Sequence, residues 1–304
     1  MPNSSMIEVA GRQLKLSNLD KIFYPAISFT KGQVIDYYIR IAPVLLPHLN
    51  SRPLTLKRYP NGALEKFFYQ KECPSSRPAW LPTVPVWSES NNKNTNFCLV
   101  GDIPALIWSA NLAALELHTS LSLAQNILQP TMIVFDLDPG PPAGILECLQ
   151  VSLWLREILE KNSLKCYPKT SGSKGLQVYL PLNTPTTYDI TKNFAHMIAR
   201  VLEQTYPDKV VSNMRKSLRK GKVFVDWSQN DDHKTTVCVY SLRARELPTV
   251  STPVSWSEIE NALTKNDPDL LVFDSNQVLA RVTKQGDLFA PVLTVQQRLP
   301  KLDF

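Results

Sequence analysis

The chain has 304 residues, of which 43% are hydrophobic and 20% charged, a globular composition that excludes large-scale disorder and permits one large core or two smaller ones. Lysine and arginine exceed aspartate and glutamate by 33 − 27 = 6, which favours a polyanionic partner only where the positive charge is clustered. The sequence has no apolar run of about 18 residues and opens without a secretory signal, so we expect a soluble, cytoplasmic protein with no membrane partner.

The first third of the chain contains segments with strand-like and helical patterns. Thr30 is a candidate N-cap for a helix whose apolar residues recur at helical spacing over 34–42, and Pro43 and Pro47 are expected to limit that helix. The other elements expected here are a strand over 7–16, two strands in 54–62 and 66–72 around a turn at Pro60-Asn61-Gly62, and a helix over 102–115.

The second half alternates β-branched strands with amphipathic helices. The strands are expected within 131–139, 176–182, 222–227 and 235–240, and the helices over 145–161, 190–205 and, in the tail, 255–263. This order predicts an α+β or α/β protein with a central mixed sheet flanked by helices.

The five cysteines are an odd number, widely spaced, with no C-x-x-C pair: Cys73, Cys98, Cys148, Cys166 and Cys238. This pattern is typical of an intracellular protein without a structural zinc site. We therefore expect reduced thiols.

Two aspartates alternate with apolar residues at the end of the strand predicted within 131–139. Because Asp136 and Asp138 are two residues apart on a strand, both side chains leave the same face. Their mutual repulsion is relieved most simply by a divalent cation, and hard carboxylate oxygens suit Mg²⁺ or Mn²⁺. Two solvated acids at a strand end are an equally good interpretation of this pair alone.

A third acid, Asp226, ends the apolar run Lys222–Val225, where an isolated carboxylate is costly to bury unless it is paired. Three carboxylates on strands can hold two cations, one that activates a 3′-hydroxyl and one that binds triphosphate and pyrophosphate oxygens. This combination favours polymerase chemistry.

The segment Thr170–Tyr179, TSGSKGLQVY, is a Gly/Ser turn that leads into a strand. Its glycines allow backbone N–H groups to form an anion-binding nest, and Ser171 and Lys174 add a hydroxyl and a positive charge suited to a triphosphate. A serine-rich hairpin is the alternative. The chain lacks G-x-x-x-x-G-K-[ST], which excludes a P-loop NTPase.

Basic residues cluster on both sides of Asp226 in the sequence. They are Arg215, Lys216, Arg219, Lys220 and Lys222 before it, and Arg243 and Arg245 after it. A basic run is most often a solvated face, but the position of this one beside the proposed metal ligands favours phosphate neutralisation. Lys21 and Lys31, together with Phe67 and Phe68, give the first third the cations and rings that suit a DNA end.

These motifs together resemble the polymerase domain of bacterial DNA ligase D, the end-joining branch of the archaeo-eukaryotic primase superfamily. The resemblance runs almost end to end, through NLDKIFYP, KRYPNG, LELH, VFDLDPG, TSGSKGLQVY, MRKSLRKGKVFVDWSQN and YSLRAR. It implies a primase-type catalytic core, two Mn²⁺ or Mg²⁺ ions, NTP or dNTP substrates with ribonucleotides preferred, and gap filling at double-strand breaks. The implied partners are DNA with gaps or 3′ overhangs, a DNA ligase and a Ku-type end-binding protein, at the nucleoid of a prokaryotic cell.

The resemblance also implies roles for individual residues. The catalytic metal ligands are expected at Asp136, Asp138 and Asp226. Nucleotide contacts are expected at His118, Ser171, Lys174, Gln177, Gln229, Arg243 and Arg245. Contacts to a recessed 5′-phosphate are expected at Asn18, Lys21 and Lys31, a template-stacking ring at Phe67 or Phe68, and further DNA contacts at Arg215, Lys216, Arg219 and Lys220.

One position departs from the family pattern: Gln177 stands where the second motif has histidine. Glutamine can donate a hydrogen bond to phosphate but cannot carry charge or transfer a proton. A DNA-end-binding and bridging module with weak catalysis is therefore the main alternative to an active polymerase. A replicative primase subunit is less favoured because no Cys/His cluster has zinc-site spacing, and sealing must be done elsewhere because K-x-D-G is missing.

We expect one primase-polymerase domain over 1–304, with an N-terminal α/β subregion packed on the catalytic core. The subregions are 1–125 with the DNA-end contacts, 126–247 as the catalytic core and 248–304 as a C-terminal wrap.

Overall fold

The computed structural model describes residues 4–88 and 92–300, which form two compact units. Unit 1 consists of Met1–Ser120, Thr235–Ser251 and Phe273–Gly286, and unit 2 consists of Leu121–Lys234, Thr252–Val272 and Asp287–Phe304. The predicted tail over 248–304 is therefore shared between the units. The single-domain organisation stays a prediction.

Unit 1 is built on a six-stranded sheet with the order β15-β9-β5-β8-β7, in which β6 also pairs with β5. The strands are β5 (Leu54–Arg58), β6 (Phe68–Gln70), β7 (Thr83–Ser88), β8 (Lys93–Cys98), β9 (Ala114–Thr119) and β15 (Thr236–Val237). The predicted pairing of the segments around Pro60-Asn61-Gly62 is confirmed, since β5 and β6 are antiparallel. The strand expected within 235–240 belongs to this sheet and is shorter than predicted, because its residues pair only with Thr119 and His118 of β9.

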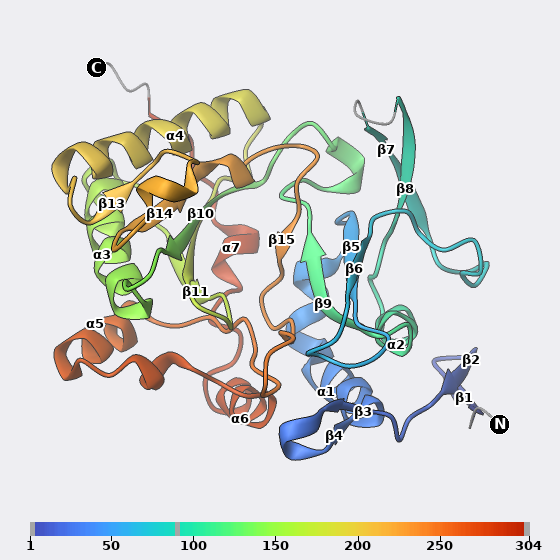
Figure 1. Ribbon diagram of the computed structural model, residues 1–304. Helices are drawn as coiled ribbons and strands as arrows, with labels where there is room; N and C mark the ends of the chain where they lie inside the picture. The colour runs from blue at the N-terminus through green and yellow to red at the C-terminus, as the bar shows by residue number, and fades with distance from the viewer. Residues whose placement is uncertain (1–3, 89–91, 301–304) are drawn as a thin grey trace. The chain divides into compact units, whose positions relative to one another are not determined.

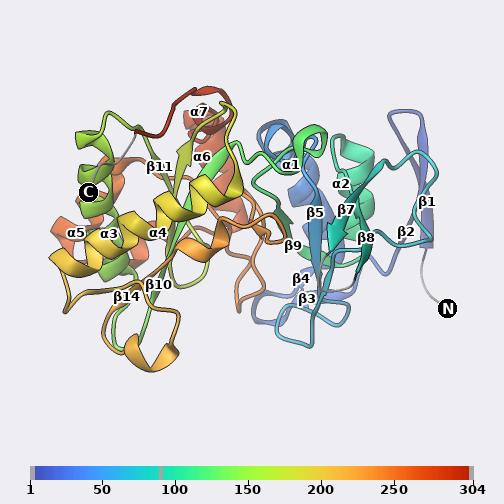
Figure 2. The same ribbon diagram turned by 90° about the horizontal axis from the view of Figure 1, so that it is seen from above.

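Two helices of unit 1 pack against each other, α1 (Lys31–Leu49) and α2 (Ile103–Asn111) (Figure 2). Thr30 caps α1 as predicted, in a capping box with Gln33. The prediction that prolines limit this helix is wrong, because α1 continues through Pro43 and Pro47. Both prolines are exposed, so the carbonyls that lose an N–H partner can bind water. Helix α2 is shorter than expected, because the chain enters β9 at Ala114.

The beginning of unit 1 forms two small hairpins. The segment expected as one strand over 7–16 is a pair, β1 (Ser4–Val9) and β2 (Arg12–Ser17). The chain turns between them because Ala10 and Gly11 both have positive φ. The second hairpin joins β3 (Ile22–Tyr24) to β4 (Phe29–Thr30), and α6 (Ser275–Gln285) returns to contact α1.

Unit 2 contains the predicted mixed sheet, in the order β11-β12-β10-β14-β13. Its strands are β10 (Met132–Pro139), β11 (Tyr167–Thr170), β12 (Leu176–Pro181), β13 (Val210–Val211) and β14 (Val223–Asp226). All pairs are antiparallel except β13 with β14. Figure 1 labels the strands of both sheets except β12.

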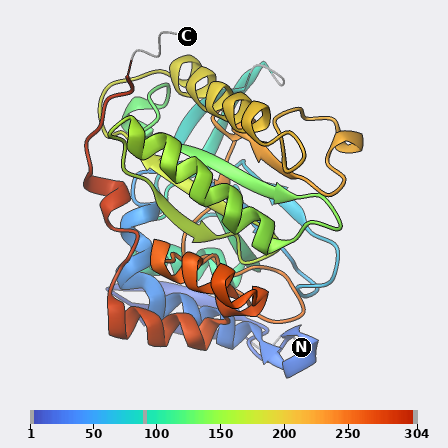
Figure 3. The same ribbon diagram turned by 90° about the vertical axis from the view of Figure 1, so that its left-hand side faces the viewer.

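The helices α3 (Ile145–Lys161) and α4 (Tyr188–Thr205) contact β10 and each other, and Figure 3 shows them side by side along the sheet. The prediction of α3 is confirmed at both ends. Helix α4 begins two residues before the prediction, because Thr187 supplies its cap. The remaining helices of unit 2 are α5 (Trp256–Lys265) and α7 (Pro291–Thr294). Within residues 4–88 and 92–300, no helix is both long and apolar enough to cross a membrane.

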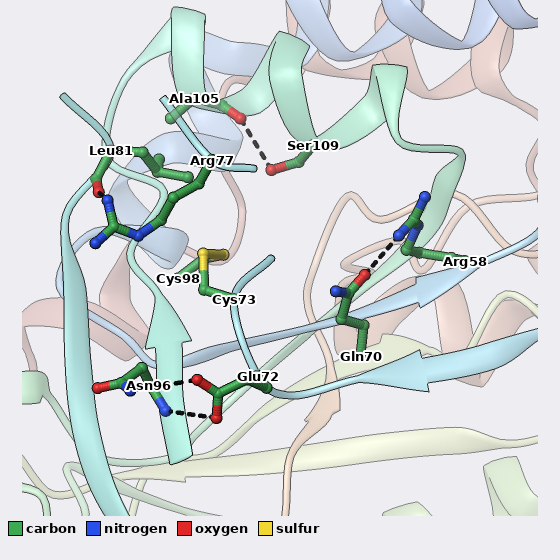
Figure 4. The surroundings of a disulfide bond; sticks show 10 residues. All are labelled: Arg58, Gln70, Glu72, Cys73, Arg77, Leu81, Asn96, Cys98, Ala105 and Ser109. Atoms are coloured by element: carbon green, nitrogen blue, oxygen red, sulfur yellow. Dashed lines mark hydrogen bonds between the residues drawn. A yellow bond between two sulfur atoms is a disulfide. The ribbon is translucent and has the colours of Figure 1, made fainter. Parts of the chain in front are cut away.

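The expectation that all cysteines are reduced is wrong. Cys73 and Cys98 form a disulfide, with their Cα atoms 5.1 Å apart (Figure 4). The segment after β6 runs beside β8, where the Cys73 amide donates to Asn96 O at 2.7 Å and the Glu72 carboxylate accepts from the Asn96 side chain. Spacing in the sequence could not reveal this pairing, since it depends on the sheet bringing distant segments together. Cys148, Cys166 and Cys238 are free and buried, as expected.

We predict that Cys73→Ser lowers the free energy of unfolding by about 3.5 kcal/mol, the chain-entropy value for a loop of this length. The loop spans 25 residues, and denaturant titration of the non-reduced proteins measures the effect. Cys238→Ser is the matched control, because it changes a buried thiol without removing a cross-link. Equal stability of parent and Cys73→Ser would contradict the disulfide.

Candidate active site

The three predicted metal ligands lie on two adjacent strands of unit 2. Asp136 on β10 is directly opposite Asp226 on β14, so the two side chains share one face of the sheet. Asp138 follows on the same face of β10, while Phe135 and Leu137 point to the other face and are fully buried. The register of this one strand pair thus collects all three carboxylates.

The electrostatics of this carboxylate group fit a cation. Burial, and then the neighbouring charges of Asp138 and Asp226, raise the pKa of Asp136 to about 7. Burial and the two neighbouring carboxylates both oppose ionisation of Asp136, and a bound cation would offset both effects. The all-oxygen donor set suits Mg²⁺ or Mn²⁺, so the residues fit the ions that the sequence predicts.

The Asp226 carboxylate is held by the turn that follows β14. Its Oδ1 accepts from the Ser228 amide at 2.9 Å and from the Ser228 hydroxyl at 2.6 Å. Its Oδ2 accepts from Gln229 Nε2 at 2.9 Å, so Gln229, expected at the nucleotide, contacts a metal ligand here. The same turn is fastened to β10, because buried Asn230 exchanges two hydrogen bonds with the Val134 backbone.

The Gly/Ser turn lies beside β10. A Cβ at Gly175 would be 2.2 Å from the Leu137 carbonyl oxygen, so only glycine permits this approach. Ser171 Oγ accepts from the amides of Ser173 and Gly175, both at 3.2 Å, and fixes the turn. Lys174 is exposed at its tip.

The basic segment also returns to β10. Gly221 N donates to Gly140 O at 3.0 Å, and a Cβ at Gly140 would be 1.9 Å from the Arg219 carbonyl oxygen. The guanidinium of half-buried Arg219 lies 3.7 Å from the ring centroid of Phe224, the residue opposite Asp138. The other predicted DNA contacts of this segment are exposed: Arg215, Lys216 and Lys220.

Unit 1 contains a second charged group, in which three basic side chains surround one carboxylate. Glu116 on β9 is 2% exposed and lies 3.0 Å from His118 Nε2, 3.3 Å from Lys57 Nζ and 3.4 Å from Arg243 Nε. Its Oε1 also accepts from the Tyr59 hydroxyl at 2.9 Å. We call these five residues the Glu116 cluster.

The charges of the Glu116 cluster do not balance. Burial raises the pKa of Glu116, but the His118 hydrogen bond and the charges of Arg243 and Lys57 outweigh it and hold the pKa well below its ordinary value. Burial lowers the pKa of His118 and of Lys57, against the opposing effect of Glu116. Lys57 and Arg243 therefore share a single buried anion, and the surplus of positive charge suits an anionic ligand. Arg245 is exposed two residues further on.

The residues expected at a 5′-phosphate lie close together in unit 1. Backbone bonds link Lys21 N to Asn18 O at 3.1 Å and Lys31 N to Lys21 O at 2.8 Å. Asn18 and Lys21 are exposed, and Lys21 Nζ donates to Pro60 O and to Asn61. Lys31 is buried, and burial with the charge of Lys21 lowers its pKa to about 8.

The two predicted stacking rings are exposed on and beside β6. Phe67 is 49% and Phe68 45% exposed, which is unusual for rings of this size. Lys57 Nζ lies 4.3 Å from the Phe67 centroid, and the Arg58 guanidinium 5.1 Å from that of Phe68. These rings are presented to solvent next to the Glu116 cluster.

Comparison with known proteins agrees with the geometry. Residues 30–289 match the family described as LigD, primase-polymerase domain. The chain belongs to this family. It is 41% identical over 282 residues to the multifunctional non-homologous end joining protein LigD of Mycolicibacterium smegmatis, and 33% identical over 275 residues to the bifunctional LigD protein of Bacillus subtilis. These alignments cover 92% and 90% of this chain but only 36% and 43% of the relatives, so the chain spans less than half of their length.

A solved structure shows the same fold. The polymerase domain of Mycobacterium tuberculosis ligase D in complex with DNA superposes with a TM-score of 0.85 at 38% identity. The match covers 93% of this chain and 99% of that domain. The α+β primase-polymerase fold predicted from the motifs is confirmed, and with it the enzyme class of a nucleotidyltransferase.

Two buried residues contact the expected site residues but were missed by the sequence interpretation, Glu116 and Lys169. Lys169 on β11 is fully buried and donates from Nζ to Gln177 at 2.6 Å. The contact could have been predicted from the hairpin, because Lys169 and Gln177 lie on either side of the Gly/Ser turn and are paired across it. Glu116 stands in the LELH motif, and a single acid in an apolar strand is itself a signal of pairing.

A separate group of possible metal ligands, Asp231, Asp232 and His233, lies after the turn of β14, with ligand atoms within 4.8 Å of one another. Asp231 already forms ion pairs with Lys192 and His233. We assign no metal to this group.

We predict that Glu116→Gln lowers the free energy of unfolding by about 3 kcal/mol at pH 7, because it leaves buried basic groups without their anion. The low pKa of Glu116 means that its charge stabilises the fold above about pH 4.5 and that this contribution is lost as the pH falls. Denaturant titrations should show the difference shrinking in acid. Glu65→Gln, at an exposed position, is the control, and an equal effect of both variants would contradict the cluster.

Proposed function

We propose that this chain adds nucleotides, preferably ribonucleotides, to the 3′ ends of DNA at gaps and breaks during non-homologous end joining. Its relatives carry the name of end-joining proteins, and the similar solved domain is described in complex with DNA. We propose in addition that a DNA ligase and a Ku-type protein act with it, in the cytoplasm of a prokaryotic cell.

The observation that carries this proposal is the shared face of Asp136, Asp138 and Asp226 at the β10–β14 pair. When bound there, two Mn²⁺ or Mg²⁺ ions would activate the 3′-hydroxyl and stabilise the charge that develops on the triphosphate and pyrophosphate. The three aspartates would hold these ions. Ser228 and Gln229 keep the Asp226 carboxylate oriented, since they bond both of its oxygens.

Nucleotide contacts are proposed at the residues that the family resemblance implies, and each is supported by the geometry of its own unit. In unit 2, Lys174 is exposed at the tip of a turn whose N–H groups Ser171 organises, which suits a triphosphate. In unit 1, the surplus charge of the Glu116 cluster supports phosphate contacts by His118 and Arg243, with Arg245 beside them.

DNA contacts are proposed for the basic and aromatic surfaces. Asn18, Lys21 and Lys31 would bind the 5′-phosphate across the gap, and their adjacent positions support this. Exposed Phe67 or Phe68 would stack on a template base. Further backbone contacts are proposed for Arg215, Lys216, Arg219 and Lys220.

Asp136→Asn should reduce primer extension by about 1000-fold or more, because a metal ligand supplies several kcal/mol of transition-state stabilisation. DNA affinity should stay within about twofold in a fluorescence anisotropy titration. Asp189→Asn, at an exposed acid on α4, is the control. Extension by the Asp136→Asn variant at more than a few per cent of the parent rate would reject the assignment. A parent protein that binds DNA ends but extends no primer would favour the end-binding module instead.

Lys21→Ala should abolish the preference for a gapped duplex with a 5′-phosphate over one without it, while extension of a simple primed template continues. Loss of a lysine that contacts only the 5′-phosphate affects only DNA that has this phosphate. Loss of a general backbone contact weakens binding to every DNA and lowers the salt dependence of binding. Lys93→Ala, also exposed in unit 1, is the control. An equal loss on phosphorylated and unphosphorylated gaps would make Lys21 a backbone contact only.

A further inference from the structure

Four polar side chains form a continuous row across the sheet of unit 2. Lys169 on β11 is directly opposite Gln177 on β12, Gln177 is opposite Asp136 on β10, and Asp136 is opposite Asp226 on β14. Directly opposed residues have neighbouring side chains on the same face. The row therefore runs from a buried ammonium group through an amide to two of the expected metal ligands.

Hydrogen bonds connect the members of this row. Lys169 Nζ donates to Gln177 Oε1 at 2.6 Å. The Gln177 side chain is also hydrogen-bonded to the Asp136 carboxylate, which lies directly opposite it on β10. Because the amide oxygen accepts from Lys169, the amide NH₂ is the group that donates to Asp136. Gln177 is thus oriented at both ends.

The burial of these residues limits what else they can do. Lys169 is 0% and Gln177 2% exposed, so neither side chain is presented to solvent. The Lys169 ammonium also lies 5.4 Å from the centroid of the Tyr179 ring. The row therefore places the positive charge of Lys169 behind Gln177, on the side of the amide that faces away from Asp136.

We propose that Gln177 is a positioning residue for the metal site, oriented by Lys169, that fixes the Asp136 carboxylate as a ligand through its amide NH₂. This inference rests on the proposed function, because it takes Asp136 as a ligand of Mn²⁺ or Mg²⁺. It differs from the sequence-based expectation that Gln177 contacts the triphosphate. It also explains how glutamine can stand at a histidine position, because neutral imidazole likewise accepts at one nitrogen and donates at the other.

The test measures Mn²⁺ affinity by electron paramagnetic resonance, without DNA or nucleotide. Gln177→Leu removes the donor to Asp136 and the acceptor for Lys169, so the Mn²⁺ dissociation constant should rise about 10-fold to 100-fold, the range for lost partners of metal ligands. Gln177→His retains a donor for Asp136 and an acceptor for Lys169, and its Mn²⁺ dissociation constant should stay within about threefold of the parent value. Gln204→Leu, the same change at an exposed position on α4, is the control.

Lys169→Met gives an independent variant of similar size. It leaves Gln177 without its buried donor, and Mn²⁺ affinity should fall in the same direction as in Gln177→Leu. Thermal unfolding of each variant tests whether it is folded. If Gln177→Leu does not fold, the Mn²⁺ affinities of Lys169→Met and Gln177→His decide whether the proposal holds. Unchanged Mn²⁺ affinity in folded Gln177→Leu or Lys169→Met, with a raised KM for NTP, would overturn the proposal and return Gln177 to the triphosphate.

The outcome for the proposed function is read separately. A parent protein that binds Mn²⁺ but extends no primer would reject the polymerase proposal while the affinity series still tests Gln177. A parent that binds no Mn²⁺ would overturn the positioning role as well.

Discussion

The repulsion between carboxylates on β10 and β14 is the constraint on which the rest of unit 2 depends. Asp136 and Asp226 are held opposite each other by backbone pairing, so neither can move away without breaking the ladder. The surrounding structure offsets this repulsion in two ways. Gln177 donates to Asp136 from one side, and Ser228 with Gln229 bonds Asp226 on the other. Cations between the carboxylates would complete this compensation.

The loops around the carboxylates are close to β10 because two glycines allow it. Gly175 brings the Gly/Ser turn against Leu137, and Gly140 lets the basic segment pass at Arg219. A side chain at either glycine would collide with backbone, which moves far less easily than the end of a flexible side chain. The proposed phosphate contacts of both loops and the proposed metal ligands Asp136 and Asp138 are therefore placed by the same strand.

In unit 1 a buried carboxylate, Glu116, is surrounded by basic groups. There, one buried carboxylate holds several basic groups in fixed positions, and Glu116 stays ionised in spite of its burial because those groups outweigh the desolvation. The basic groups around Glu116 are therefore held in fixed orientations within unit 1. Preorganised charge of this kind is worth more to a phosphoryl-transfer site than flexible lysines in water.

The sequence by itself determined the family, the mixed sheet, the ends of α3, the cap at Thr30 and the three acids, because these depend on local pattern and on motifs contiguous in the chain. Tertiary structure decided everything that needs two distant segments to meet. The Cys73–Cys98 disulfide, the pairing of β15 with β9 and the partners of Glu116 are of this kind. The passage of α1 through its prolines was decided in the same way, because local propensity opposes it and tertiary packing of the buried face supports it. The position of Lys169 behind Gln177 likewise follows from strand register, which a linear pattern indicates only when both partners of a hairpin are known.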